Sequence, residues 1–126
     1  MAFYVDGLGN ITLVQGDSGK LVVEGLDANK NYTVFFAIQD KNRKPIGSEL
    51  EVNSNNSTSI VFEIKGDLTD LLTVKKTEET ATYYYGIKVC DAETGFEDTL
   101  TLGDTEGADI GDLNTITVYP KKVEGI

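Results

Sequence analysis

The chain has 126 residues, of which 40% are hydrophobic, and carries 11 Lys and Arg against 21 Asp and Glu, a formal net charge of −10. That length and hydrophobic content fit one folded domain and exclude disorder as its main state, and the acidic surface disfavours binding to nucleic acid or to anionic membranes. The sequence has no His and one Cys, Cys90, so the commonest general base, a cysteine-based zinc site and an intrachain disulfide are all excluded.

The N-terminal segment, residues 1–9, precedes the first clear alternating stretch. It contains the aromatic pair Phe3 and Tyr4. We expect either an arm, whose exposed aromatics dock onto a neighbouring molecule, or an extra edge strand of the same domain. No basic region or apolar stretch marks a signal peptide, and no run of about 20 apolar residues would span a bilayer. We therefore expect a domain made in the cytoplasm.

Apolar residues then recur with a period of two, the pattern of half-buried strands. The segments 11–14 and 21–24 form the first pair, and Gly16 to Gly19 between them predict a tight hairpin. The segment 32–39 is apolar on one face and partly apolar on the other, which predicts a strand covered on both sides. Further strands are expected at 49–52, 59–64, 82–90, 99–102 and 115–119.

One stretch, residues 67–72, has a helical pattern, with Asp67 as the expected N-cap. It is too short for more than one or two turns. About eight strands separated by polar turns predict an all-β sandwich of antiparallel strands over residues 10–120, followed by a tail at 121–126.

Three consecutive tyrosines lie within the segment 82–90. Tyr83 and Tyr85 share one face of this strand, and Tyr84 lies on the other, beside Gly86. Tyrosine combines an apolar ring with a polar tip and is enriched at protein interfaces. Tyr84 is therefore a candidate contact residue, with packing inside the sandwich as the alternative.

An acidic, glycine-rich loop spans residues 103–112. It holds four carboxylates that we regard as candidate interface residues: Asp104, Glu106, Asp109 and Asp112. Several oxygens on a bending chain would suit Ca²⁺, but the spacing differs from that of the twelve-residue calcium loop. A solvated loop is the preferred interpretation, and we expect no metal and no cofactor.

Catalysis is disfavoured by the same sequence. Paired carboxylates of a glycosidase would be one route to an enzyme, but most carboxylates lie in turns and there is no Trp for a sugar platform. Neither Ser, Thr nor Lys has a recognisable base partner. We expect a protein without enzymatic activity.

Two parts of the chain resemble a known family. The segment 10–19, Asn-Ile-Thr-Leu-Val-Gln-Gly-Asp-Ser-Gly, leads to the strand at 32–38. Near the other end, 84–89 leads through the turn 91–95 to the strand at 114–120. This order is similar to the N-terminal immunoglobulin-like domain of bacteriophage baseplate upper proteins and related tail proteins, over about residues 10–120.

The resemblance implies a structural protein of the virion, synthesised in the bacterial host cytoplasm, that contacts other virion proteins or copies of itself. Baseplate members continue into a helical region that forms trimers, and this sequence ends at Ile126. A head-decoration or neck component therefore stays open as an alternative. A carbohydrate- or surface-binding module of the same fold is a further one.

Overall fold

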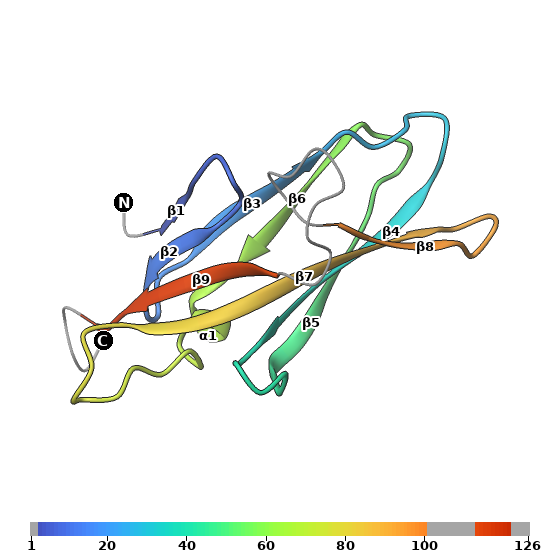
Figure 1. Ribbon diagram of the computed structural model, residues 1–126. Helices are drawn as coiled ribbons and strands as arrows, with labels where there is room; N and C mark the ends of the chain where they lie inside the picture. Colours follow the sequence, from blue (N-terminus) through green and yellow to red (C-terminus); the bar gives the residue numbers. More distant parts are fainter. Residues whose placement is uncertain (1–2, 101–112, 122–126) are drawn as a thin grey trace.

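A computed structural model describes residues 3–100 and 113–121 and shows two β-sheets packed face to face (Figure 1). The described part contains nine strands and one short helix. In chain order they are β1 (Phe3–Val5), β2 (Ile11–Val14), β3 (Gly19–Glu24), β4 (Tyr32–Gln39), β5 (Pro45–Asn53), β6 (Ser59–Ile64), α1 (Gly66–Thr69), β7 (Ala81–Asp91), β8 (Glu97–Leu100) and β9 (Asn114–Tyr119).

The larger sheet has the strand order β1-β2-β9-β7-β4-β5, and β8 joins it by pairing with β7. Strand β7 pairs with β4 on one side, while its other side pairs with β9 along residues 81–85 and with β8 along residues 87–90. Strands β2 and β9 are parallel, and the other pairs are antiparallel. An early and a late segment of the chain are thereby joined, because β2 lies beside β9.

The smaller sheet consists of β3 and β6, paired antiparallel along six residues each. The core fills the space between the two sheets. Phe36 of the larger sheet lies at its centre, with its ring centroid 5.6 Å from that of Phe62 in the smaller sheet and 5.1 Å from that of Tyr85. All three rings are buried, so burial of these large apolar surfaces is what joins the two sheets.

The all-β sandwich predicted from the alternating pattern is confirmed. Strands β2, β4 and β6 have the predicted limits, and the inward residues of β4 (Val34, Phe36 and Ile38) are buried. The prediction that β4 is covered on its opposite face as well is wrong, because Ala37 is exposed and its neighbours on that face are half-buried. Among the described residues, the second sheet packs on the inward face of β4 only.

The predicted hairpin at Gly16 to Gly19 is also wrong. Strand β2 belongs to the larger sheet and β3 to the smaller sheet, so this turn carries the chain from one sheet to the other. Gly16 has a φ of +90°, a conformation that favours glycine, and its carbonyl lies directly against Gly66. A polar turn between two alternating segments fixes a change of direction, but it does not fix which strands pair.

The helical segment is shorter than predicted and begins earlier. Helix α1 is one turn over Gly66–Thr69, with Lys65 at the N-cap, so Asp67 lies inside the first turn and is not the cap. Thr69 is buried, and its hydroxyl donates a hydrogen bond to the carbonyl of Asp17, 2.7 Å away. This contact holds α1 against the turn that links β2 to β3.

Candidate functional site

The two N-terminal aromatics lie in different surroundings. Residues 3–5 form β1, an edge strand paired with β2. Phe3 is half-buried, and its ring lies over Gly19, where an added Cβ would come within 2.1 Å of the ring. Of the two alternatives for this segment, residues 3–5 therefore form the extra edge strand, and Phe3 is not an exposed ring, because the absence of a side chain at Gly19 lets the ring pack inward. Tyr4, on the opposite face, is 63% exposed.

Tyr84 lies on the outer face of the larger sheet, as its position opposite the buried Tyr85 predicted. It pairs across the sheet with Gln39 of β4 and Thr115 of β9 and is half-buried. Together with Arg43 it lines a shallow hollow of about 450 Å³ at this end of the sheet. Tyr84 is thus part of a surface that a partner can reach.

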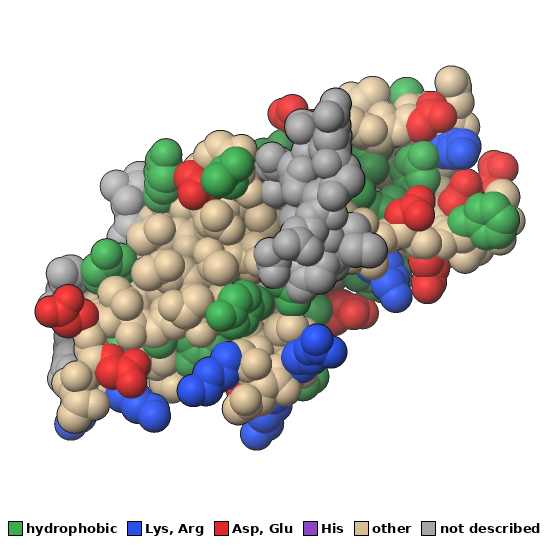
Figure 2. Space-filling view, in the orientation of Figure 1, with side chains coloured by type: hydrophobic (Ala, Val, Ile, Leu, Met, Phe, Trp, Pro, Cys, Tyr) green, Lys and Arg blue, Asp and Glu red, His purple; other side chains and the backbone are tan. Residues whose placement is uncertain are grey.

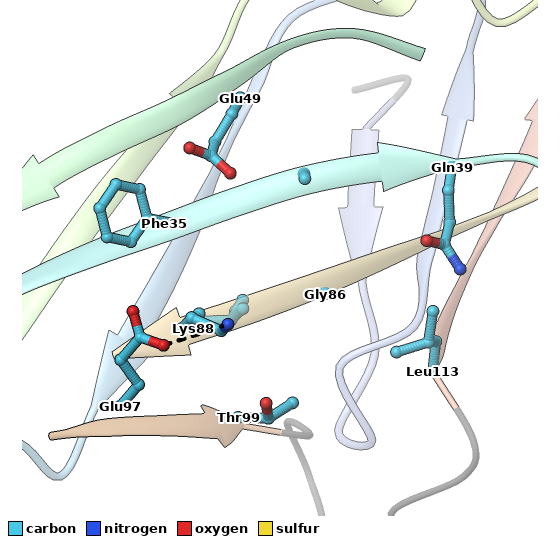
Figure 3. A pocket seen from close by; sticks show the side chains of 10 residues that line it. Phe35, Gln39, Glu49, Gly86, Lys88, Glu97, Thr99 and Leu113 are labelled. Atoms are coloured by element: carbon cyan, nitrogen blue, oxygen red, sulfur yellow. Dashed lines mark hydrogen bonds and ion pairs between the residues drawn. The ribbon is translucent and has the colours of Figure 1, made fainter. Parts of the chain in front are cut away.

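A second hollow of about 440 Å³ adjoins it on the same face (Figure 3). Its floor is formed by the small residues Ala37 and Gly86, which lie opposite each other in β4 and β7. The larger side chains of Phe35 and Leu113 line its sides. Gln39 and Leu113 line both hollows. The two hollows therefore adjoin along the outer face of the larger sheet, and together we call them the trough.

The charges around this trough differ between its two ends. Lys and Arg side chains gather at the β4–β5 turn, and acidic side chains gather at the β7–β8 hairpin (Figure 2). At the acidic end Lys88 lies 3.5 Å from the carboxylate of Glu97. This pair is half-exposed and adds little stability. Glu49 and the carboxylates of the β7–β8 hairpin give this end its acidic character.

The smaller sheet has a different character. Strands β3 and β6 pair with each other, and within the described residues neither has a partner on its outer edge. A groove of about 440 Å³ lies beside β3, between this strand and residues 5–9. A groove of about 420 Å³ lies beside β6, between it and β5. Unpaired edges flanked by open space are places where another strand can add.

The outward side chains of this sheet alternate between charge and apolar surface. Val22 and Val61 face each other across the two strands and are 48% and 42% exposed. On one side of this pair Lys20 lies opposite Glu63, and on the other side Glu24 lies opposite Ser59. This site was not among the predicted ones, although an outward Val at the centre of each strand is a signal of it in the sequence.

Two titratable groups have environments that shift their pKa. Burial, reinforced by the negative charge of Asp6, raises the pKa of the Tyr85 hydroxyl, which donates a hydrogen bond to the Gly9 carbonyl. The pKa of Asp91 is lowered, chiefly because its carboxylate accepts a hydrogen bond from the backbone N–H of Glu93, 2.9 Å away. Both groups are structural: one anchors the β1–β2 turn and the other closes the β7–β8 hairpin.

The four acidic candidates at 104–112 lie outside the described residues. Within the residues that are described, no three His, Cys, Asp or Glu side chains come close enough together to hold a metal ion. The same part of the chain holds no helix that is both long and apolar enough to cross a membrane.

Comparison with known proteins gives a fold relationship. No protein-family model matches the chain, and no curated protein matches it. Among solved structures, the periplasmic chaperone SfaE matches with a TM-score of 0.59 at 10% sequence identity, over 94% of this chain and 57% of the chaperone chain. The chain therefore spans little more than half the length of that protein. The match establishes the immunoglobulin-like β-sandwich fold.

The expected function, a structural protein of the phage virion, is wrong on these findings. The fold that supported it is shared with a periplasmic chaperone, and no family model or curated protein connects the chain to a phage. The alternatives of a head or neck component and of a carbohydrate- or surface-binding module receive no support either. The family resemblance itself stays a prediction, since short strand-and-turn motifs recur in many immunoglobulin-like sandwiches.

Proposed function

We propose that this chain is a non-enzymatic protein-binding domain that accepts an extended strand of another polypeptide at the sheet formed by β3 and β6. The observation that carries the proposal is that neither strand of that sheet has a partner on its outer edge among the described residues. Constant-type immunoglobulin sandwiches divide seven strands into four and three. Here the described strands divide into seven and two.

The grooves beside β3 and β6 support this function. Leu50 and Val52 of β5 line the groove beside β6, and they are half-buried side chains that an added strand would cover. On the other side, Val5 and the glycines at 7 and 9 border β3. A strand placed in either groove gains backbone hydrogen bonds from the sheet and covers apolar surface.

The outward surface indicates the chemistry of the partner strand. An added strand would set its own outward residues beside Val22, which lies between Lys20 and Glu24, or beside Val61, which lies between Ser59 and Glu63. Cross-strand pairs of β-branched residues and of opposite charges each contribute about 0.2–1 kcal/mol. At the β3 edge the favoured partner is therefore an alternating segment with a β-branched residue between two charged ones.

A selection from a random library of twelve-residue peptides tests this function. The full chain serves as target, and a Thr12→Lys variant serves as the matched control for a Val61→Lys variant. Thr12 is also exposed on a strand, but β2 is paired on both sides. Bound peptides are located by the amide chemical-shift changes that they cause, and each is resynthesised with a central proline, which cannot donate to a sheet.

The proposal requires peptides that alternate apolar and polar residues and that shift the amides of β3 or β6. These peptides must lose binding when they carry the central proline, and they must bind the Val61→Lys variant more weakly than the Thr12→Lys variant. Peptides that bind instead at Phe35, Tyr84 and the trough would contradict it and would assign the function to the larger sheet. A library from which nothing is enriched would contradict it as well.

A further inference from the structure

We propose that the strand accepted at β3 is β3 of a second copy of this chain, related by a two-fold axis that passes beside Val22. This inference rests on the proposed function and names its partner. The two β3 strands would run antiparallel and join the smaller sheets of both copies into one sheet of four strands, in the order β6-β3-β3-β6.

The outward residues of β3 are complementary to themselves under this symmetry. Lys20, Val22 and Glu24 are spaced two apart and are all exposed. In an antiparallel pair centred on Val22, the Lys20 side chain of each copy faces Glu24 of the second copy, and the two Val22 side chains face each other. One two-fold contact thus contains two opposite-charge pairs around an apolar pair, an isologous interface.

The inward side of β3 allows the same pairing. Leu21 and Val23 are buried in the core and would lie opposite each other across the axis, so the joined sheet keeps one continuous apolar face. The groove between β3 and residues 5–9 is the space into which the second strand enters. No side chain of β3 has to move from the inward to the outward face to make this contact.

The edge of β6 lacks this complementarity. Its outward residues are Ser59, Val61 and Glu63, so an antiparallel pair centred on Val61 sets a serine hydroxyl opposite each carboxylate. Such a contact has no opposite-charge pair. The charge pattern therefore selects β3 over β6 as the edge that meets its own copy.

A head-to-tail contact is the competing arrangement. If β3 of one copy pairs with β6 of the next in the register seen within the chain, Lys20 faces Glu63 of the next copy. That contact gives one opposite-charge pair per interface, and its repetition would build an open filament. The two-fold contact gives two such pairs and closes on itself, which favours a discrete dimer.

Sedimentation equilibrium of the full chain in 0.15 M salt, over a range of concentrations, tests the inference. Salt screens the mutual repulsion of two copies that each carry a net charge of −10. Each single reversal, Lys20→Glu or Glu24→Lys, changes two charge pairs at once because of the symmetry. We expect at least a tenfold weaker dimer for each.

Two double variants distinguish the two-fold contact from the head-to-tail contact. Lys20→Glu with Glu24→Lys restores the opposite charges across the two-fold contact and should return dimerisation to within about threefold of the wild type. Lys20→Glu with Glu63→Lys restores the pair inside one chain and the head-to-tail pair, but it leaves like charges across the two-fold contact, so it should stay monomeric. Far-ultraviolet circular dichroism checks that each variant is folded.

Rescue by the second double variant would overturn the two-fold contact in favour of the head-to-tail one. A wild-type chain that is monomeric at all concentrations would also overturn it, whereas binding of selected peptides at β3 or β6 would leave the proposed function standing. A dimer that none of these reversals weakens would place the contact on another surface and overturn the inference too.

Discussion

The edge strand β5 and the edges of the β3–β6 sheet show two opposite treatments of an unpaired strand. Strand β5 begins with Pro45 and bulges after Ile46: between two consecutive paired positions it advances four residues while β4 advances two. Proline and bulges are the devices with which proteins prevent strand addition. Strands β3 and β6 contain no proline and pair in an unbroken register.

The β5 edge therefore resists the addition of a strand, whereas the edges of the smaller sheet do not. The bulge places Gly47 in a conformation with a φ of +70° and lets the Leu68 side chain of α1 lie against it. The β5 edge of the larger sheet is thus bent at the bulge, and Leu68 covers it there. The smaller sheet keeps straight edges with an apolar pair at the centre of its outward face, the arrangement expected of a binding surface.

The largest expected effect comes from separating the two sheets. Phe36→Ala removes the ring that packs on both Phe62 and Tyr85, and we expect it to lower the free energy of unfolding by about 3–5 kcal/mol. Urea unfolding followed by fluorescence and by circular dichroism measures this. The matched control is Phe96→Ala, which removes a ring that is 77% exposed and should cost less than about 0.5 kcal/mol. Similar losses for both variants would contradict the assignment of Phe36 to the joint between the sheets.

A smaller loss of unfolding free energy is expected when a side chain is added at the bulge of β5. Gly47→Ala forces a side chain into a left-handed conformation, at a cost of about 1–2 kcal/mol. Its Cβ also comes within 2.6 Å of Leu68, which adds about 1–3 kcal/mol unless Leu68 moves. Gly25→Ala is the control, because its φ of +84° is similar and nothing lies within 4 Å of an added Cβ. Equal unfolding free energies for the two variants would show that the contact with α1 does not hold the bulge.

A buried hydroxyl helps to fix the wall of the groove beside β3. Tyr85→Phe removes the hydrogen bond to the Gly9 carbonyl and leaves that acceptor without this partner, at a cost of about 1–3 kcal/mol. Amide hydrogen exchange at residues 6–9 should also accelerate. Tyr84→Phe, one residue along on the outer face, should change neither quantity. If residues 6–9 exchange as slowly in the Tyr85→Phe variant as in the wild type, the hydroxyl is not what anchors the turn.

The smallest expected effect depends on pH and lies away from both edges. The pKa of Asp91 is lower in the folded chain than in the unfolded chain, so its contribution to stability is complete above the ordinary aspartate pKa of 3.8 and is lost as the pH falls through the lower, folded value. Between pH 5 and pH 3 the wild type should therefore lose more stability than Asp91→Asn, whose amide oxygen can still accept the bond from Glu93. Parallel pH profiles of the two proteins would contradict the lowered pKa.

The sequence predicted strands far better than it predicted their partners. A period of two identifies which side chains share a face, and so β4 and β6 were found with correct limits and Tyr84 was placed opposite Tyr85. The same pattern carries no information on which sheet a strand joins, which is why the prediction of a hairpin at Gly16 to Gly19 is wrong. The packing of Phe3 over Gly19 was likewise missed, because it joins residues 16 positions apart through space alone.

The candidate site was only partly predictable for the same reason. An exposed Val between charged residues is visible in the sequence, but an unpaired edge exists only once the neighbouring strands have been placed. The acidic candidates at 104–112 lie outside the described residues. Tyr84 lies on an accessible surface, although on the sheet opposite to the proposed site.

The most direct test of the account is amide hydrogen exchange measured at increasing concentrations of the unmodified chain. Two-fold pairing at β3 predicts that amides within Gly19–Glu24 become more protected as the concentration rises, while those of Pro45–Asn53 at the bulged edge do not change. Protection that grows in β5, with β3 unchanged, would contradict the account. It would show that the bulged edge, and not the smaller sheet, is the surface that accepts a second chain.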